Sequence, residues 1–348
     1  MKAAVWTGKD KIEVRELPIP EIGGEEALIR VSAAGVCATD YHIISGQLAI
    51  GRPPNVQGHE ICGRIEKINS SRKDLSVGQR CVIATSIGCG KCAYCREGKQ
   101  YLCKDSSEIG FYPHNGGYAE YVKLPVSCIV PIPDEVSDLA GSILESVVCP
   151  AESLMRVGIP FGSTVLVTGA GAAALGYIAV AKALGAGKII SLVRREEKAR
   201  LVLRFGADEA VDSSKVGNVE DEILSRTGGE GADVVIETTG APAIISACPF
   251  YCKKGGRIVQ YGIPADGDTV TVPVKRLVTG EIAVYGTVGN TKAWYPLIEM
   301  IKSGRLNVEK MVTHTFRIEE IDRAFDLYRN HDKSLIKAVI LFDGEQGK

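Results

Sequence analysis

Short runs in which apolar and polar residues alternate dominate the first part of the chain. Glycine, proline and other turn-forming residues bound each run, a pattern typical of β-strands. We expect strands at residues 2–6, 13–17, 27–36, 60–68, 79–84 and 118–124. Up to about residue 133 the sequence therefore predicts an all-β module.

From about residue 154 the pattern changes to β-type runs that alternate with helical ones. Helical periodicity, with apolar residues three or four positions apart, marks residues 172–184 and 197–205. The β-type runs lie at residues 164–168, 188–193, 232–236, 257–261 and 282–286. This alternation predicts an α/β domain with a doubly wound parallel sheet.

The end of the chain carries two helical patterns, at residues 294–303 and 318–330, and then an apolar strand at 336–342. That last strand suits a return to the first module. We therefore expect one domain made of residues 1–153 and 292–348 and a second made of residues 154–291. Two domains agree with a length of 348 residues.

Charge and composition exclude several classes of partner. Lys and Arg number 41 and Asp and Glu 42, so the net charge is 41 − 42 = −1, and no broad positive field exists to hold nucleic acid or an anionic membrane. The uncharged stretch 157–181 contains a proline and several glycines, which indicates a buried strand, turn and helix and not a membrane span. Charged residues interrupt the N-terminus before a signal sequence develops. We expect a cytoplasmic protein whose eleven cysteines stay reduced.

Four cysteines fall in a CxxCxxCx7C array, at Cys89, Cys92, Cys95 and Cys103. Four thiolates at this spacing can close a tetrahedral shell around Zn²⁺, which would make the site structural. Neighbouring lysines and arginines would offset its negative charge. An iron–sulfur cluster or unligated thiols are the alternatives, although the ferredoxin pattern has a shorter last spacing followed by proline.

A second group of potential ligands is dispersed along the chain. Cys37 stands in Gly-Val-Cys-Ala-Thr-Asp-Tyr-His, His59 and Glu60 in Gly-His-Glu, and Glu145 in Ile-Leu-Glu-Ser. One thiolate, one imidazole and one carboxylate leave a fourth position open on zinc, as a catalytic site requires. The alternative is a buried cysteine near a hydrogen-bonded core histidine.

A glycine-rich turn follows the predicted strand at 164–168. Gly169, Gly171 and Ala174 form GxGxxA, in which the glycines permit the tight turn and the approach of a pyrophosphate, and the small third residue lets helix pack on strand. The next strand ends at Val193, where NAD-specific sites place an acidic residue. Arg194 and Arg195 follow and favour the 2′-phosphate of NADP; the alternative is NAD, with Glu196 or Glu197 at the ribose.

In this order and at these separations, GxCxTDxH, GHE, CGxCxxCx7C and GxGxxA resemble the zinc-dependent medium-chain dehydrogenases/reductases over essentially the whole chain. The Glu145 position, the His59-Glu60 context and Val-Thr-His314 resemble the sorbitol and polyol dehydrogenase branch. The resemblance implies a GroES-like β-rich catalytic domain and a Rossmann domain, with one catalytic and one structural zinc.

The resemblance also implies residue roles at the catalytic metal. Cys37 and His59 would bind zinc, and Glu60 and Glu145 are the candidates for the carboxylate ligand. Asp40 would accept a hydrogen bond from the far nitrogen of His59 and fix its tautomer.

Other roles implied by the resemblance concern substrate and cofactor. Thr39 would hold the substrate hydroxyl, and His42 would pass its proton onward. Lys337 would reach the cofactor pyrophosphate, or else be a surface lysine.

The implied reaction moves a hydride between a small secondary alcohol, of polyol or sugar type, and NADP or NAD, with zinc as a Lewis acid. The resemblance further implies a homodimer or homotetramer, joined near residues 269–274 and 282–286. Polyol dehydrogenases have proline where this chain has Ser146, and an arginine of some of them is replaced around residues 288–290. The alternatives are therefore a threonine-type amino-alcohol dehydrogenase, a simple alcohol dehydrogenase, and a non-enzymatic crystallin-like member.

Overall fold

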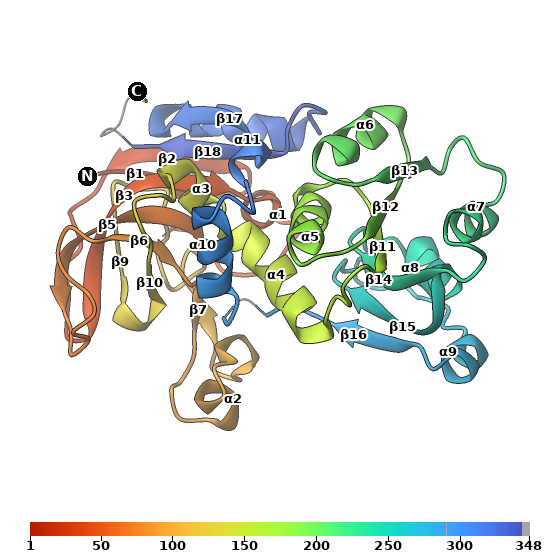
Figure 1. The fold of residues 1–348 in the computed structure, drawn as a ribbon. Coiled ribbons are helices and arrows are strands. Elements are labelled where there is room, and N and C mark those ends of the chain that lie inside the picture. Colours follow the sequence, from red (N-terminus) through yellow and green to blue (C-terminus); the bar gives the residue numbers. More distant parts are fainter. Residues whose placement is uncertain (290, 343–348) are drawn as a thin grey trace. The chain divides into compact units, whose positions relative to one another are not determined.

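A computed structural model describes residues 1–289 and 291–342 (Figure 1). Asn290, and the end of the expected first domain at residues 343–348, lie outside the described residues. The chain divides into two compact units, one of Met1–Val148 with Asn290–Lys348 and one of Cys149–Gly289. Within the described parts, no helix has both the length and the apolar character needed to cross a membrane.

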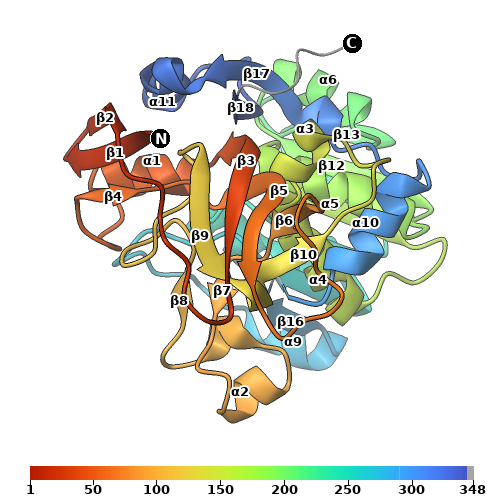
Figure 2. The same ribbon diagram turned by 90° about the vertical axis from the view of Figure 1, so that its left-hand side faces the viewer.

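The first unit is built around the long strand β3 (Glu26–Val36), which is buried along most of its length. It pairs antiparallel with β5 (Glu60–Asn69), β9 (Tyr121–Pro125) and β18 (Lys337–Leu341). The sheet order is β10-β6-β5-β3-β18-β17, with β10 at Ile129–Pro131, β6 at Arg80–Ile83 and β17 at Val312–Arg317. Figure 2 shows β9, β3, β5 and β6 side by side.

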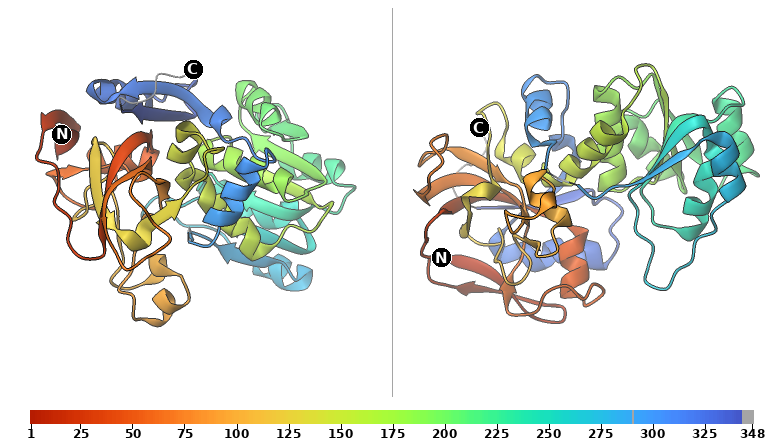
Figure 3. Two further views of the ribbon diagram at one scale, coloured as in Figure 1. Left: turned by 60° about the vertical axis from the view of Figure 1, so that its left-hand side comes forward. Right: turned by 90° about the horizontal axis from the view of Figure 1, so that it is seen from below.

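The C-terminal strand was predicted from its apolar pattern and is confirmed. In β18, Ala338 lies opposite Val36 of β3, so the last segment of the chain completes the sheet that the first segment began. Figure 3 shows this blue segment beside the red and orange N-terminal strands. The helices α10 (Trp294–Lys302) and α11 (Ile321–Arg329) belong to the same part of the chain.

The remaining strands of the first unit form two small sheets. The order β2-β1-β4 joins β2 (Lys11–Glu16), β1 (Lys2–Gly8) and β4 (Asn55–Val56). The strands β7 (Ser86–Ile87) and β8 (Ser107–Glu108) pair with each other. Between them in the sequence lie α2 (Ala93–Arg96) and the 3-10 helix η1 (Gln100–Leu102).

The prediction that the first 133 residues are all-β is wrong at α1 (Ala38–Ile44). This helix has only seven residues, too few for a helical apolar period to show in the sequence. Two more helices, α3 (Asp138–Ser142) and α4 (Glu145–Val157), follow the β-rich region.

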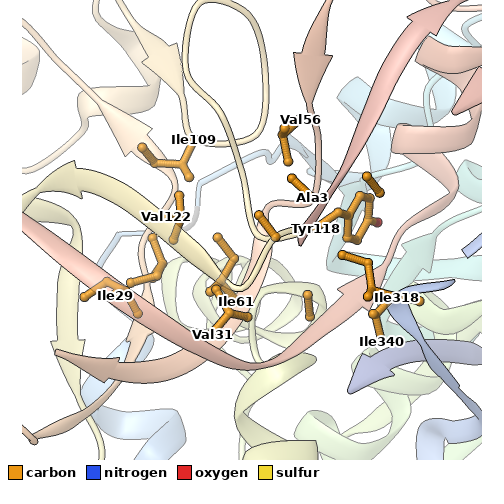
Figure 4. Packing of buried hydrophobic residues seen from close by; sticks show 14 of the residues in the cluster. Ala3, Ile29, Val31, Val56, Ile61, Ile109, Tyr118, Val122, Ile318 and Ile340 are labelled. Atoms are coloured by element: carbon orange, nitrogen blue, oxygen red, sulfur yellow. The ribbon is translucent and has the colours of Figure 1, made fainter. Parts of the chain in front are cut away.

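Apolar side chains from the sheets fill one core in the first unit (Figure 4). Tyr118 is fully buried within it, near Val56 of β4, Ile340 of β18 and Ile318, which directly follows β17. Its ring packs edge-on against Phe325 of α11, with the ring centroids 6.1 Å apart. The phenolic hydroxyl is the polar end of this core residue and must find a partner.

The second unit is a six-stranded parallel sheet of order β13-β12-β11-β14-β15-β16, which confirms the doubly wound prediction. Its strands are β11 (Thr164–Thr168), β12 (Lys188–Val193), β13 (Glu209–Asp212), β14 (Ala232–Glu237), β15 (Cys252–Gln260) and β16 (Ala283–Gly286). The connecting helices are α5 (Ala172–Ala183), α6 (Glu196–Arg204), α7 (Val219–Arg226), α8 (Pro242–Tyr251) and α9 (Val274–Gly280). The strand β13 was not predicted, because its four residues give only one fully buried position.

Candidate metal centres and cofactor turn

Four cysteine sulfurs gather in the lobe between β7 and β8. Figures 1 and 2 both place α2 of this lobe away from the strands β3 and β5. The Sγ atoms of Cys89, Cys92, Cys95 and Cys103 all lie within 4.8 Å of one another. Four thiolates this close fit a tetrahedral zinc ion with no open position.

Backbone N–H groups support the sulfurs of this cluster. The N–H of Cys95 donates to Cys92 Sγ at 3.4 Å, and the N–H of Asp105 donates to Cys103 Sγ at 3.4 Å. Backbone donors at Lys91 and the following residue lower the pKa of Cys89 to about 6. Burial raises the pKa of Cys95 instead. The thiolate is the form that binds metal, so the four close sulfurs and the thiolate favoured at Cys89 fit the predicted structural site.

The second group of ligands forms where β3 ends and β5 begins. Gly35 lies opposite Glu60 in the antiparallel register, so Cys37, just past the end of β3, comes close to His59 and Glu60. Cys37 also caps the N-terminus of α1. The ligand atoms of Cys37, His59 and Glu60 all lie within 4.8 Å of one another. Strand pairing thus unites two motifs that are more than twenty residues apart.

Asp40 orients the imidazole of His59. Its Oδ1 lies 3.1 Å from His59 Nδ1, and its Oδ2 accepts hydrogen bonds from Tyr118 Oη at 2.6 Å and from the N–H of Cys37 at 3.3 Å. An ionised carboxylate only accepts, so Nδ1 carries a hydrogen whether or not His59 is protonated, and Nε2 is the nitrogen at which a metal would take the place of a proton. The hydrogen bond between Asp40 and His59 was predicted and is present.

Burial and charge act against each other at this pair. Burial disfavours the ionised carboxyl of Asp40, but the charge of His59 and the hydrogen bonds from His59 and Tyr118 outweigh it and lower the pKa of Asp40. Burial likewise opposes protonation of His59, whereas Asp40 and Cys37 raise its pKa well above the ordinary value. The site is therefore rich in negative charge, as a cation requires.

Glu145 opens α4 and faces the same histidine. Its Oε2 lies 3.9 Å from His59 Nε2, and its side chain is 15% exposed. Burial raises its pKa, with the nearby charge of Glu60 adding to the effect and that of His59 opposing it. Both Glu60 and Glu145 thus approach His59, and Glu60 also lies within 4.8 Å of the Cys37 sulfur.

The two residues predicted to handle substrate lie on α1. Thr39 is half-buried, with its Oγ1 3.6 Å from Cys37 Sγ. His42 is exposed and stands three residues further along the helix, on the same side of it as Thr39. Their roles toward a hydroxyl and its proton stay predictions.

Lys337 is not a surface lysine, which corrects one of the two alternatives drawn from the sequence. It begins β18, is 3% exposed, and its Nζ lies 2.5 Å from Glu60 Oε1 and 3.4 Å from Val36 O. Its predicted contact with the pyrophosphate stays a prediction, and the ion pair with Glu60 is a contact that the sequence did not indicate.

The predicted cofactor turn links β11 to α5. Gly169 has φ +98°, and a Cβ there would come within 2.7 Å of Thr238 Oγ1, so only glycine fits. A Cβ at Gly171, which caps α5, would meet no atom within 4 Å. Ala174 is fully buried in the first turns of the helix. An open helix N-terminus behind a tight glycine turn fits a dinucleotide phosphate.

Three residues around the Cys37–His59 site were not identified from the sequence. Tyr118 holds Asp40, Phe111 lies with its ring centroid 5.2 Å from that of His59, and Ser146 Oγ donates to Glu60 Oε1 at 2.7 Å. The departure from proline at Ser146 was the one signal available for that residue.

Comparison with known proteins gives consistent matches over both units. Residues 23–134 match the family model described as alcohol dehydrogenase GroES-like domain, and residues 173–303 match that described as zinc-binding dehydrogenase. Sorbitol dehydrogenase of Bacillus subtilis (strain 168) is 28% identical over 343 residues, covering 98% of this chain and 97% of that protein. L-threonine 3-dehydrogenase of the same strain is 33% identical over 320 residues, covering 90% and 91%.

One solved structure has a similar fold over almost the whole chain. It is that of a protein from Sinorhizobium meliloti 1021, assigned as a zinc-binding dehydrogenase and bound to NADP. Its TM-score is 0.91 at 29% sequence identity, over 98% of this chain and 99% of that one.

Proposed function

The chain belongs to the zinc-containing alcohol dehydrogenase family, and we propose that it transfers a hydride between a secondary alcohol of polyol or sugar type and NADP. The enzyme class, a zinc-dependent alcohol dehydrogenase that uses a nicotinamide cofactor, follows from the family. The observation that carries the proposal is the convergence of Cys37, His59 and a carboxylate on one point. Three such ligands leave zinc one position for an alcohol oxygen.

Zinc, when bound, supplies a Lewis acid for the alcohol oxygen, and the nicotinamide supplies the hydride acceptor. The chain's own residues orient these groups. We assign Cys37, His59 and either Glu60 or Glu145 as ligands, and Asp40 as the residue that keeps His59 Nε2 free of hydrogen. Thr39 would accept the substrate's hydroxyl hydrogen, and exposed His42 would carry the proton toward solvent.

Substrate turnover separates the polyol proposal from its main alternative. The relative with the higher identity acts by name on L-threonine, and Ser146 replaces the proline of polyol dehydrogenases, so an amino alcohol is the second candidate. Initial rates of NADP and NAD reduction would be measured with polyols, sugars, amino alcohols and simple secondary alcohols. A rate confined to L-threonine would overturn the polyol assignment. If the zinc-loaded protein reduced neither cofactor with any of these substrates, the proposed dehydrogenase activity would be overturned.

NADP is proposed because of the charges that follow β12. Val193 ends the strand, and both Arg194 and Arg195 are exposed. Among residues 1–289 and 291–342, Arg194 makes no ion pair. Glu196 is engaged by Arg200 and Lys215, each at 2.7 Å, and is therefore poorly placed to serve a ribose.

The NAD alternative rests on one carboxylate. Glu197 Oε1 is buried and has no hydrogen-bond partner within the described chain, and Arg195 lies 3.8 Å from it. A ribose hydroxyl would satisfy such an acceptor.

Replacing Arg194 and Arg195 together by alanine is expected to raise the KM for NADP about 10- to 100-fold. A hydrogen bond to a charged group contributes about 1.5–3 kcal/mol, and two guanidinium groups would contact the 2′-phosphate. The KM for NAD should change no more than about twofold, and Arg200→Ala serves as a control for general loss of surface charge. Equal effects on the two cofactors would contradict the assignment.

We also propose a homodimer or homotetramer, with β16 at the contact. This strand is an edge of the sheet, and its Val284 is 52% exposed; Val278 and Val288, which precede and follow the strand in the sequence, are 69% and 60% exposed. An apolar edge strand favours pairing with a second copy. Light scattering should give two or four times the chain mass of 37.2 kDa; a single-chain mass would contradict it.

A further inference from the structure

Glu60 is held by two donors at one oxygen and by none at the other. Its Oε1 accepts from Lys337 Nζ at 2.5 Å and from Ser146 Oγ at 2.7 Å. Its Oε2 is buried and has no hydrogen-bond partner in the described part of the chain. A buried carboxylate oxygen without a partner is costly unless something binds it.

The surroundings of Glu60 leave it little freedom. Its side chain is fully buried, and a Cβ on Gly35, opposite it in β3, would come within 2.2 Å of Oε2. The carboxylate therefore lies against bare backbone beside Cys37 and His59. A divalent cation at these two ligands would satisfy the free oxygen without disturbing the two donors on Oε1.

Ser146 links the two candidate carboxylates. It follows Glu145 in the first turn of α4, so this one turn carries one possible ligand and the hydroxyl that holds the other. A proline at this position, as in the polyol dehydrogenases that the sequence resembles, has no side-chain donor. Proline is nevertheless tolerated in the first turn of a helix, so the exchange itself is compatible with α4.

We propose that Ser146 is a positioning residue for the catalytic metal: with Lys337 it holds Glu60 Oε1, leaves Oε2 as the accepting atom, and thereby sets the affinity of the Cys37–His59 site for a divalent cation. The inference rests on the proposed zinc chemistry of this site. On this proposal, a proline at position 146 would remove a hydrogen bond that orients the carboxylate of Glu60.

The test compares the full-length variants Ser146→Ala, Ser146→Pro and Ser146→Thr with the unchanged protein. Each is first loaded with one equivalent of Zn²⁺, which we expect the four-cysteine lobe to take, and is then titrated with Co²⁺ against a chelator. Hydrogen-bond partners of ligands typically change metal affinity 10- to 100-fold. We expect Ser146→Ala and Ser146→Pro to bind Co²⁺ about 10-fold more weakly, with shifted visible absorption bands.

Two variants make the result specific. Ser146→Thr keeps a hydroxyl and should restore both the affinity and the spectrum. Ser142→Ala is the control, because Ser142 lies nearby in the sequence but donates to the Leu139 carbonyl of its own helix, at 2.9 Å, and not to Glu60. It should bind Co²⁺ like the unchanged protein.

Several outcomes would overturn the proposal. Unchanged Co²⁺ affinity and spectra in Ser146→Ala and Ser146→Pro would do so, as would a Ser146→Thr variant as weak as alanine. A lower melting temperature of the metal-free protein without any change in Co²⁺ binding would indicate a purely structural serine. None of these measurements needs turnover, so an inactive protein that shows the affinity shift would overturn the proposed function and leave this inference standing.

Discussion

Replacing Asp40 by asparagine is expected to remove most of the activity, by about 1,000- to 10,000-fold in kcat/KM. Oδ2 of Asp40 accepts from Tyr118 and from the Cys37 N–H, so the asparagine carbonyl would take that place. Its NH₂ group would then face His59 Nδ1, now 3.1 Å from Oδ1. A donor there selects the tautomer with hydrogen on Nε2, and that nitrogen has no lone pair for a metal.

Zinc content and initial rates of the Asp40→Asn variant would check this result. Zinc should fall from two toward one per chain, with the four-cysteine site still filled. Tyr118→Phe is the graded control, because it removes one donor to Asp40 and leaves the tautomer of His59 unchanged; we expect a loss of about tenfold. An asparagine variant that retains two zinc ions and a rate within tenfold would contradict the role of Asp40.

The residues that sequence reasoning identified stand in short motifs. Cys89 and Cys92, and likewise Gly169 and Gly171, lie close enough in sequence for spacing alone to indicate their chemistry. Many of the longer strands and helices were also predicted, since apolar periodicity has room to show over six or more residues. The helices α4 and α8, each with a proline inside it, and the strand β17 were not predicted, although they have thirteen, ten and six residues. The helix α1 and the strand β13 were missed because they are too short.

The contacts that complete the site could not be predicted, because they join distant parts of the chain. Tyr118 and Asp40 are 78 residues apart, Ser146 and Glu60 are 86 apart, and Lys337 and Glu60 are 277 apart. Each pairing follows from the tertiary fold and not from any local pattern; Lys337 and Glu60, for example, begin the two strands β18 and β5 that flank β3. The sequence therefore indicated the ligands and Asp40, whereas the contacts of Tyr118, Ser146 and Lys337 needed the fold.

Lys337 and Glu60 form a buried ion pair, and breaking it is expected to reduce the stability of the protein strongly. Replacing Lys337 by methionine is expected to lower the free energy of unfolding of the metal-free protein by about 3–5 kcal/mol, because it leaves a fully buried carboxylate without its counter-charge. Zinc at Cys37 and His59 would supply positive charge to that carboxylate. The loss should therefore be smaller in the zinc-loaded protein, and denaturant unfolding with and without zinc would measure both values.

Three comparisons decide what Lys337 does. Lys188→Met removes a lysine whose partner Glu209, at 2.6 Å, is about one-third exposed, and should cost no more than about 1 kcal/mol. The double variant Glu60→Gln with Lys337→Met should regain most of the loss, since no buried charge then stands alone. An equal loss in Lys337→Met and Lys188→Met would contradict a buried pair.

Cofactor binding tests the other predicted role of Lys337. If Lys337 also bound the pyrophosphate, its replacement would raise the Kd for NADP. A Kd unchanged within twofold, together with the loss of stability, would assign Lys337 to Glu60 alone.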